Sequence, residues 1–145
     1  MALDGLLSGI SHKLNFVEAN GNIISFALKE SFQAKEDATI GKEIFMDGTV
    51  RHPKFCQGWS GSFVLAETSD IVDRYFSNFE LNYLNGGNQL DIIIDEYKTY
   101  EDGTTTHYQY KDCVLTLTDG GTFSGTAIAK QTISFNASTK QPAAT

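Results

Sequence analysis

The sequence predicts a mainly β domain: an antiparallel two-sheet β-sandwich or partly closed barrel, with one packed α-helix and an extended loop. Several segments alternate apolar and polar residues with a period of two, as half-buried strands do. Asn-Gly and Asp-Gly pairs, which favour tight hairpin turns, stand between these segments. A single stretch has helical periodicity instead. So many long strands leave edges unpaired in one small chain, and we expect copies of the chain to pair through them.

The bulk properties favour one globular domain that spans residues 1–145. Hydrophobic residues make up 41% of the chain and aromatic residues 12%, which is enough for one core. The 18 acidic and 11 basic residues give a net charge of −7, which disfavours specific binding to nucleic acid. The chain has no apolar run long enough for a membrane span and no basic n-region before its first apolar residues. We therefore expect no membrane anchor and synthesis in the cytoplasm.

The first half of the chain predicts a hairpin followed by a long connection. After an N-terminal segment, residues 14–17 and 23–32 flank the turn pair Asn20-Gly21. In the second of these strands the apolar residues share one parity: Ile24, Phe26, Leu28 and Phe32. From residue 33 to 55 the pattern weakens, with a short strand expected at 44–46 and a turn at Asp47-Gly48. Such a segment is either a binding loop or a meandering surface loop.

A strand and the one predicted helix come next. The strand covers residues 58–67, and Thr68, Ser69 and Asp70 are candidate helix N-caps. Gly86-Gly87 ends the helix. We expect its apolar residues to form the face that packs on the sheet: Ile71, Val72, Tyr75, Phe76, Phe79 and Tyr83.

The second half predicts a long hairpin and a last strand. Residues 90–100 and 105–118 flank the turn pair Asp102-Gly103, and a shift in apolar parity predicts a bulge near Asp112. A final strand is expected over residues 123–135. The tail, 136–145, is expected to be loose.

No residue pattern predicts catalysis, a cofactor or a metal site. The histidines lie far apart and are expected at the surface or in turns, and Cys56 and Cys113 are expected to be buried free thiols. Residues 58–62, Gly-Trp-Ser-Gly-Ser, differ from a nucleophile elbow in the fifth residue and in the strand that follows. Asp91 and Asp95 share a strand parity, so a wet sheet face explains them without an acid pair.

Five segments in order carry a family resemblance: KEDATIGKEIFMDGTVRHP, CQGWSGSF, SDIVDRYFSNFELNYLNG, YEDGTTTHYQYKDCVLTLTDGG and KQTISFNAS. Together they resemble the inner tail-tube proteins of contractile-tailed bacteriophages, over nearly the whole chain. The resemblance implies a homohexameric ring with a continuous inner β-barrel, and rings that stack into a hollow tube. Further implied partners are the tail sheath protein outside, the tape-measure protein and passing DNA in the lumen, and baseplate and tail-terminator proteins. The implied place is the virion, after synthesis in the host cytoplasm.

The resemblance also implies roles for parts of the chain. Three segments would contact the neighbouring ring: the N-terminal segment 1–11, the extended loop 33–53 and the tail 136–145. The loop supplies charged candidates for inter-ring contact: Lys35, Glu36, Asp37, Lys42, Glu43, Asp47 and Arg51. Asp91 and Asp95 are candidates to face the lumen, where carboxylates would repel DNA phosphates.

Other functions remain open from the sequence. The chain is also compatible with the tube protein of a type VI secretion system or of a phage-tail-like bacteriocin. A different class is a monomeric β-barrel that binds a small ligand with Trp59 and the tyrosines. A tail hydrolase would need an arranged acid pair, which no pattern requires.

Overall fold

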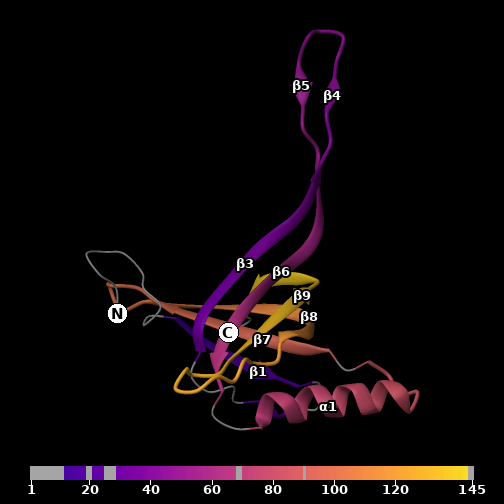
Figure 1. The fold of residues 1–145 in the computed structure, drawn as a ribbon. Coiled ribbons are helices and arrows are strands. Elements are labelled where there is room, and N and C mark those ends of the chain that lie inside the picture. Colours follow the sequence, from indigo (N-terminus) through magenta and orange to yellow (C-terminus); the bar gives the residue numbers. More distant parts are fainter. Residues whose placement is uncertain (1–11, 19–20, 25–28, 68–69, 90, 144–145) are drawn as a thin grey trace.

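A computed structural model describes residues 12–18, 21–24, 29–67, 70–89 and 91–143, and Figure 1 shows their arrangement. The fold is mainly β and antiparallel with one described helix, as the sequence predicts. The elements in chain order are β1 (His12–Val17), β2 (Ile23–Ile24), β3 (Lys29–Ile40), β4 (Glu43–Ile44), β5 (Val50–Arg51), β6 (Lys54–Ala66), α1 (Ile71–Leu84), β7 (Ile92–Thr99), β8 (Thr105–Asp119), β9 (Lys130–Ala137) and β10 (Thr139–Pro142).

Seven of the described strands follow one path, in the order β2-β1-β7-β8-β9-β6-β3, while β10 pairs with β8 beside this path and β4 pairs with β5. The 15-residue strand β8 belongs to both halves of this path, because its first part pairs with β7 and β10 and its second part with β9. Between the two parts lies Asp112, whose φ of 54° is left-handed, and the β7–β8 register shifts opposite it between Ile92 and Ile94. The predicted bulge near Asp112 is confirmed, and it bends β8 from one sheet into the other.

The bend folds the strand path over on itself, so the two halves face each other without closing into a barrel. Phe16 on β1 and Phe63 on β6 lie four places apart along the path, yet their ring centroids are 5.1 Å apart. Phe135 on β9 packs against Tyr110 on β8 at 5.4 Å in the same core. Offset and edge-on aromatic pairs of this kind fill the space between the sheets.

Helix α1 lies beside one end of the two sheets (Figure 1) and contributes Val72, Tyr75 and Phe76 to the core. The predicted packing face is wrong at both ends of the helix, because Ile71 is 36% exposed and Tyr83 is 74% exposed. Asp70 is the N-cap residue, but its carboxylate binds Arg74 rather than a backbone amide. Thr68 and Ser69 lie outside the described residues.

The predicted first hairpin is divided between the two halves. Ile23 and Ile24 pair with β1, whereas the chain from Lys29 onward pairs with β6. Local alternation gave no sign of this division because both parts are amphipathic strands. Phe26, Leu28 and the N-terminal segment 1–11 lie outside the described residues.

The C-terminal predictions need two corrections. The last strand begins at Lys130, and Phe123 before it is exposed. The supposedly loose tail continues β9 to Ala137 and then forms β10, which pairs with β8 from Thr139 to Pro142. The tail is short and polar, so its pairing depends on a partner edge that only the folded chain supplies.

Candidate assembly surfaces

The segment 33–53, expected to be a loop, is the distal part of one long β-hairpin that projects from the body (Figure 1). Strands β3 and β6 pair from Lys29 to Ile40, and the ladder continues where the Gly41 amide donates to the Pro53 carbonyl at 2.8 Å. Strands β4 and β5 then pair, and a turn at Asp47-Gly48 closes the end. We call residues 33–57 the arm. The expectation of a loop was wrong because a ribbon with solvent on both faces does not need apolar alternation.

A glycine bulge marks the point where the arm leaves the body. Glu36 pairs with Trp59 and Ala38 with Cys56, so two β6 residues, Gln57 and Gly58, face Asp37 alone. Gly58 has φ +96°, and a Cβ there would lie 2.5 Å from the Ala137 carbonyl oxygen. Pairing of β6 with β9 ends at Trp59. The arm is therefore two-stranded from this bulge outward, whereas its first residues, 33–36, still pair within the sheet.

Several predicted contact residues on the arm stabilise the arm itself. Glu36 forms an ion pair with Lys54, and Asp37 accepts a hydrogen bond from Ser60 at 3.1 Å. Asp47 accepts bonds from the amide and hydroxyl of Thr49, which lower its pKa and hold the end turn. The remaining four candidates are exposed: Lys35, Lys42, Glu43 and Arg51, with Glu43 opposite Arg51 in the β4–β5 register.

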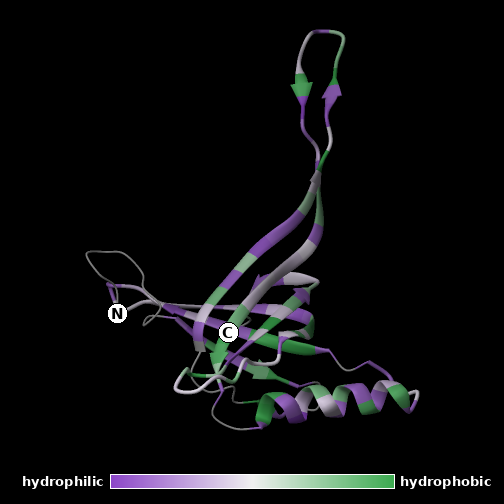
Figure 2. Cartoon of the chain, in the orientation of Figure 1, coloured by the Kyte–Doolittle hydropathy of each residue, from purple (hydrophilic) through white to green (hydrophobic). Residues whose placement is uncertain are grey.

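Sequence reasoning missed the exposed apolar side chains of the arm. The apolar positions continue to its far end (Figure 2), although the arm projects beyond the core. We call this set the arm apolar residues: Ile40, Ile44, Phe45, Met46, Val50 and Phe55. Their number in a mixed-charge segment was the available signal, since a solvated loop has no need of six large apolar side chains. A surface of this kind fits a protein partner.

Open strand edges provide further surfaces for pairing. Among the described residues β3 pairs with β6 on one side and has no strand on its other side. The second part of β8, from Val114 to Asp119, pairs with β9 and has no second described neighbour. Such edges present backbone donors and acceptors in a row, and they accept a strand from another chain.

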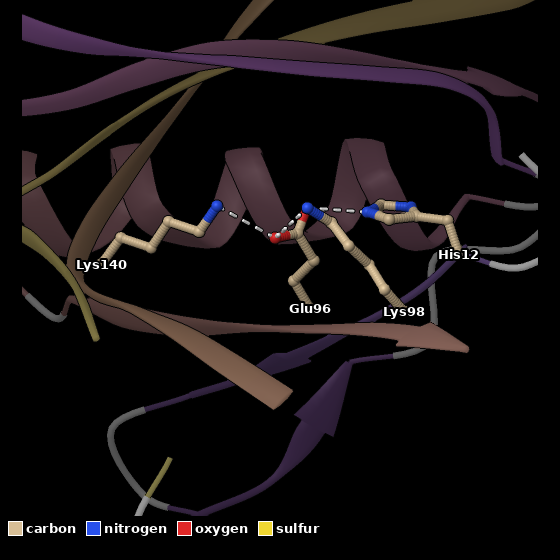
Figure 3. A network of polar contacts seen from close by, with 4 residues as sticks. All are labelled: His12, Glu96, Lys98 and Lys140. Carbon is tan, nitrogen blue, oxygen red and sulfur yellow. Dashed lines mark hydrogen bonds and ion pairs between the residues drawn. The ribbon is translucent and has the colours of Figure 1, made fainter. Parts of the chain in front are cut away.

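A buried ionic cluster holds β10 and β1 to β7 (Figure 3). Glu96 is 3% exposed, and its carboxylate lies 2.7 Å from His12, 3.4 Å from Lys140 and 3.9 Å from Lys98. Burial by itself raises the pKa of Glu96, but the hydrogen bond with His12 and the charges of Lys140 and Lys98 outweigh it. The pKa therefore lies below its ordinary value of 4.5.

Lys140 also lies over three aromatic rings. Its ammonium is 5.1 Å from the Trp59 ring and 5.3 Å from the rings of Tyr108 and Tyr110, which are cation–π distances. Burial, and after it the charge of Glu96, raise the pKa of Tyr110. Trp59 and two of the tyrosines, which the ligand-binding alternative needed as a cavity lining, thus contact the chain's own lysine.

The two carboxylates predicted for a wet face are placed differently. Asp91 is half-buried and accepts a hydrogen bond from Gln89 at 3.0 Å. Asp95 is 8% exposed and lies 3.0 Å from Nε2 of His107, whose ring stacks on Tyr97. The expectation of an open wet face is wrong for Asp95 within one chain, because the side chain of His107 on the neighbouring strand β8 lies against its carboxylate. The lumen assignment stays a prediction.

The structure also shows where the predicted histidines and cysteines lie. His12 and His107 are strand residues bound to buried carboxylates, not turn residues. Cys113 is buried and free as expected, but Cys56 is exposed on the arm. The part of the chain that the structure describes contains no cluster of three potential metal ligands. None of its described helices is long and apolar enough to cross a membrane.

Comparison with known proteins gives matches in structure alone. No family model matches the chain, and no curated protein is similar to it in sequence. A chain of the sheath–tube complex of an extracellular contractile injection system (PVC, extended state) matches with TM-score 0.59 and 15% identity. The match covers 92% of this chain and 89% of that one.

Two other matches come from the anti-feeding prophage. A chain of its tube-terminating cap has TM-score 0.59 and 14% identity over 99% of this chain and 95% of that one. A chain of its baseplate has TM-score 0.56 and 10% identity over 99% and 97%. This chain therefore has the fold found in components of contractile injection systems, and the predicted tail-tube-like fold is confirmed.

Proposed function

We propose that this chain is a structural subunit of a contractile tail: an inner-tube protein whose copies form hexameric rings that stack into a hollow conduit within a sheath. The observation that carries the proposal is the arm, a closed hairpin that extends from the body and exposes apolar side chains to its end. An isolated protein gains nothing from such a ribbon, whereas a stacked assembly buries it against the next ring.

The similarity in fold to chains of sheath–tube, cap and baseplate complexes supports this assignment. In the proposed tube the open edges of β3 and β8 pair with neighbouring copies, and the inner surface forms a continuous barrel. The conduit would hold the tape-measure protein and then pass the phage genome during ejection, without specific DNA binding. No catalytic group or cofactor takes part in this role.

A second candidate is supported by the same matches. Matched chains come from an extracellular contractile injection system and the anti-feeding prophage, and this favours as the second candidate the tube of a phage-tail-like particle, such as a bacteriocin, or of a type VI secretion system. The subunit would have the same contacts, and its cargo would be an effector or nothing. The contents of purified particles distinguish the two: DNA delivery identifies a phage tail.

The deciding experiment is negative-stain electron microscopy of the purified protein at rising concentration, with light scattering on the same samples. We expect rings and hollow tubes with a central bore. The double variant Phe45→Ser and Met46→Ser removes arm apolar side chains that contact no core, so the rings should form and fail to stack. A matched control is Ile23→Ser, which removes an exposed apolar side chain outside the arm. A wild-type protein that stays monomeric at every concentration rejects self-sufficient tube assembly.

A further inference from the structure

The arm is supported by the body on one side only. From Trp59 inward, β6 pairs with β9 on one side and with β3 on the other. Strand β3 has no second neighbour among the described strands, and outward of the bulge the two strands of the arm pair only with each other. Figure 1 shows the outer part of the arm projecting alone. The direction of the arm therefore depends on what holds β6 on its β9 side.

The root of the arm, the bulge at Gln57 and Gly58, is a point at which the ribbon can bend. Gly58 has φ +96°, and glycine has the widest backbone freedom of any residue. Bulges bend the strand that carries them, and a two-stranded ribbon has little stability of its own. Such a root acts as a hinge unless contacts from outside the ribbon fix it.

The corner between β9 and β10 packs against this root. A Cβ at position 58 would lie 2.5 Å from the Ala137 carbonyl oxygen and 3.6 Å from that of Ser138, so the Gly58 backbone lies directly against the corner. The Ser138 amide donates to the Lys111 carbonyl at 2.9 Å, where the chain passes from β9 to β10 along β8. The position of β10 therefore bears on the root of the arm.

Lys140 on β10 extends this support to the side chain next to the hinge. Its ammonium lies 5.1 Å from the ring of Trp59, which follows Gly58 on β6. The same indole packs edge-on against Tyr110 of β8, with ring centroids 6.1 Å apart. Because the Lys140 side chain is only 18% exposed, its cation–π contact is largely shielded from water, which strengthens it.

The Glu96 carboxylate fixes the lysine in turn. The ammonium lies 3.4 Å from this buried group, and Figure 3 shows Lys140 reaching Glu96 from the side opposite His12. Glu96 belongs to β7, in the other half of the strand path from β6. A continuous series of contacts thus runs from the middle of the body through Lys140 and Trp59 to the hinge.

The geometry points to Lys140 as the positioning residue of the arm. Held between the Glu96 carboxylate and the Trp59 ring, it fixes the root at Gly58 and with it the direction in which the arm leaves the body. This inference rests on the proposed function and adds what prepares the arm for stacking. An arm of fixed direction loses less conformational freedom when it docks, so it stacks at lower concentration.

The distance between the arm and the body measures this role in the single chain. Spin labels are placed at Met46→Cys in the end of the arm and at Thr116→Cys on β8, both exposed positions, in a Cys56→Ser background. The buried Cys113 stays unlabelled in the folded chain. Pulsed electron spin resonance below the concentration of assembly then gives the distribution of the distance. We expect a narrow distribution, and a broad one after Lys140→Met is added.

Three further variants make the result specific. Trp59→Leu removes the ring and keeps the ion pair with Glu96, and it should broaden the distribution as well. Lys140→Arg keeps a cation over the rings and should leave the distribution narrow. Val72→Ala creates a cavity under α1, at the opposite end of the body from the arm, and is the control for general destabilisation. Equal broadening in Val72→Ala and Lys140→Met would overturn the positioning role, as would an unchanged distribution in Lys140→Met.

Assembly of the unlabelled variants is the second readout. Lys140→Met should form rings at the concentrations at which the wild type does, but should need an about tenfold higher concentration to stack them. Lys140→Arg should stack as the wild type does. Loss of rings and tubes together in Lys140→Met would contradict a role confined to the arm.

The two readouts separate this inference from the proposed function. Wild-type tubes together with a distance distribution that Lys140→Met does not change overturn the positioning role and leave the tube intact. A distribution that broadens in Lys140→Met and Trp59→Leu, in a wild-type protein that never forms tubes, supports the positioning role and rejects the tube.

Discussion

The ammonium of Lys140 lies 3.4 Å from the Glu96 carboxylate, and this ion pair joins β10 to a strand two places away in the sheet. Four residues of β10 pair with β8, which is a short ladder for a terminal segment. The ion pair and the three aromatic rings under the ammonium add the side-chain contacts that the ladder lacks. The C-terminal strand is thus held by its backbone pairing with β8 together with the side-chain contacts of one lysine.

Replacing that lysine should release the strand. The Lys140→Met variant keeps an unbranched apolar side chain and loses the positive charge. Glu96 then loses one of its ion-pair partners, and the cation–π contacts with the three rings disappear. We expect the free energy of unfolding to fall by about 2 kcal/mol and the β10 amides to exchange faster. Hydrogen exchange with urea unfolding measures both. Lys111→Met, an exposed change on the facing strand, is the control, and equal protection of β10 in both variants would contradict the prediction.

The same cluster predicts an acid dependence of stability. The pKa of Glu96 is lowered in the folded chain, so its contribution is complete above pH 4.5 and is lost as the pH falls through the folded pKa. Below that value His12, Lys98 and Lys140 lie together without their anion. We expect Glu96→Gln to lose about 3 kcal/mol relative to wild type at pH 7 and progressively less as the pH falls below 4.5. Urea midpoints from pH 3 to 7 test this, and a constant difference would refute it.

Close neighbours, not a turn, require glycine at position 61. An added Cβ would lie 2.8 Å from the Ala34 Cα and 2.9 Å from the Phe135 ring, between β3 and the core. Gly61→Ala should therefore cost about 1 to 3 kcal/mol through overpacking. Gly120→Ala is the control, because the nearest atom to its Cβ would be a Leu117 methyl at 3.8 Å. Thermal unfolding distinguishes them, and equal melting temperatures would show that β3 shifts without cost.

Local patterns were sufficient for the elements whose pattern is set by one buried face. The helix at 71–84 and the hairpin of β7 and β8 follow directly from apolar periodicity and a turn pair. The bulge at Asp112 was predictable because it changes which parity is apolar. These features depend on neighbours within a few residues.

The candidate assembly surfaces were less predictable, for physical reasons. The arm has solvent on both faces, so its sequence does not need a periodic pattern of apolar and charged residues. Strand β10 depends on a contact between Lys140 and Glu96, which are 44 positions apart in sequence. Asp95 looked exposed by parity, but His107 from the next strand covers it. Each of these features depends on long-range partners that periodicity does not encode.

The two thiols should differ sharply in reactivity. Cys113 is buried, and burial raises the pKa of its thiol to about 12, while the S–H group donates to the Tyr110 carbonyl at 3.0 Å. Cys56 is exposed where the arm begins. Because the thiolate is the reactive form, a thiol reagent should label Cys56 quickly and Cys113 only after unfolding. Cys56→Ser should abolish the fast phase, and a fast phase that persists in this variant would contradict the assignment.

The labelling of Cys56 also reports on the arm. If the arm docks on a neighbouring ring, assembly should cover this thiol and slow its labelling, whereas the folded monomer keeps it open. We therefore expect the fast rate to fall as tubes form at rising protein concentration. The double variant Phe45→Ser and Met46→Ser should keep the fast rate at every concentration, because its rings do not stack. Slow labelling of that variant would indicate that Cys56 is covered by a contact within the ring, and the arm would then serve lateral pairing.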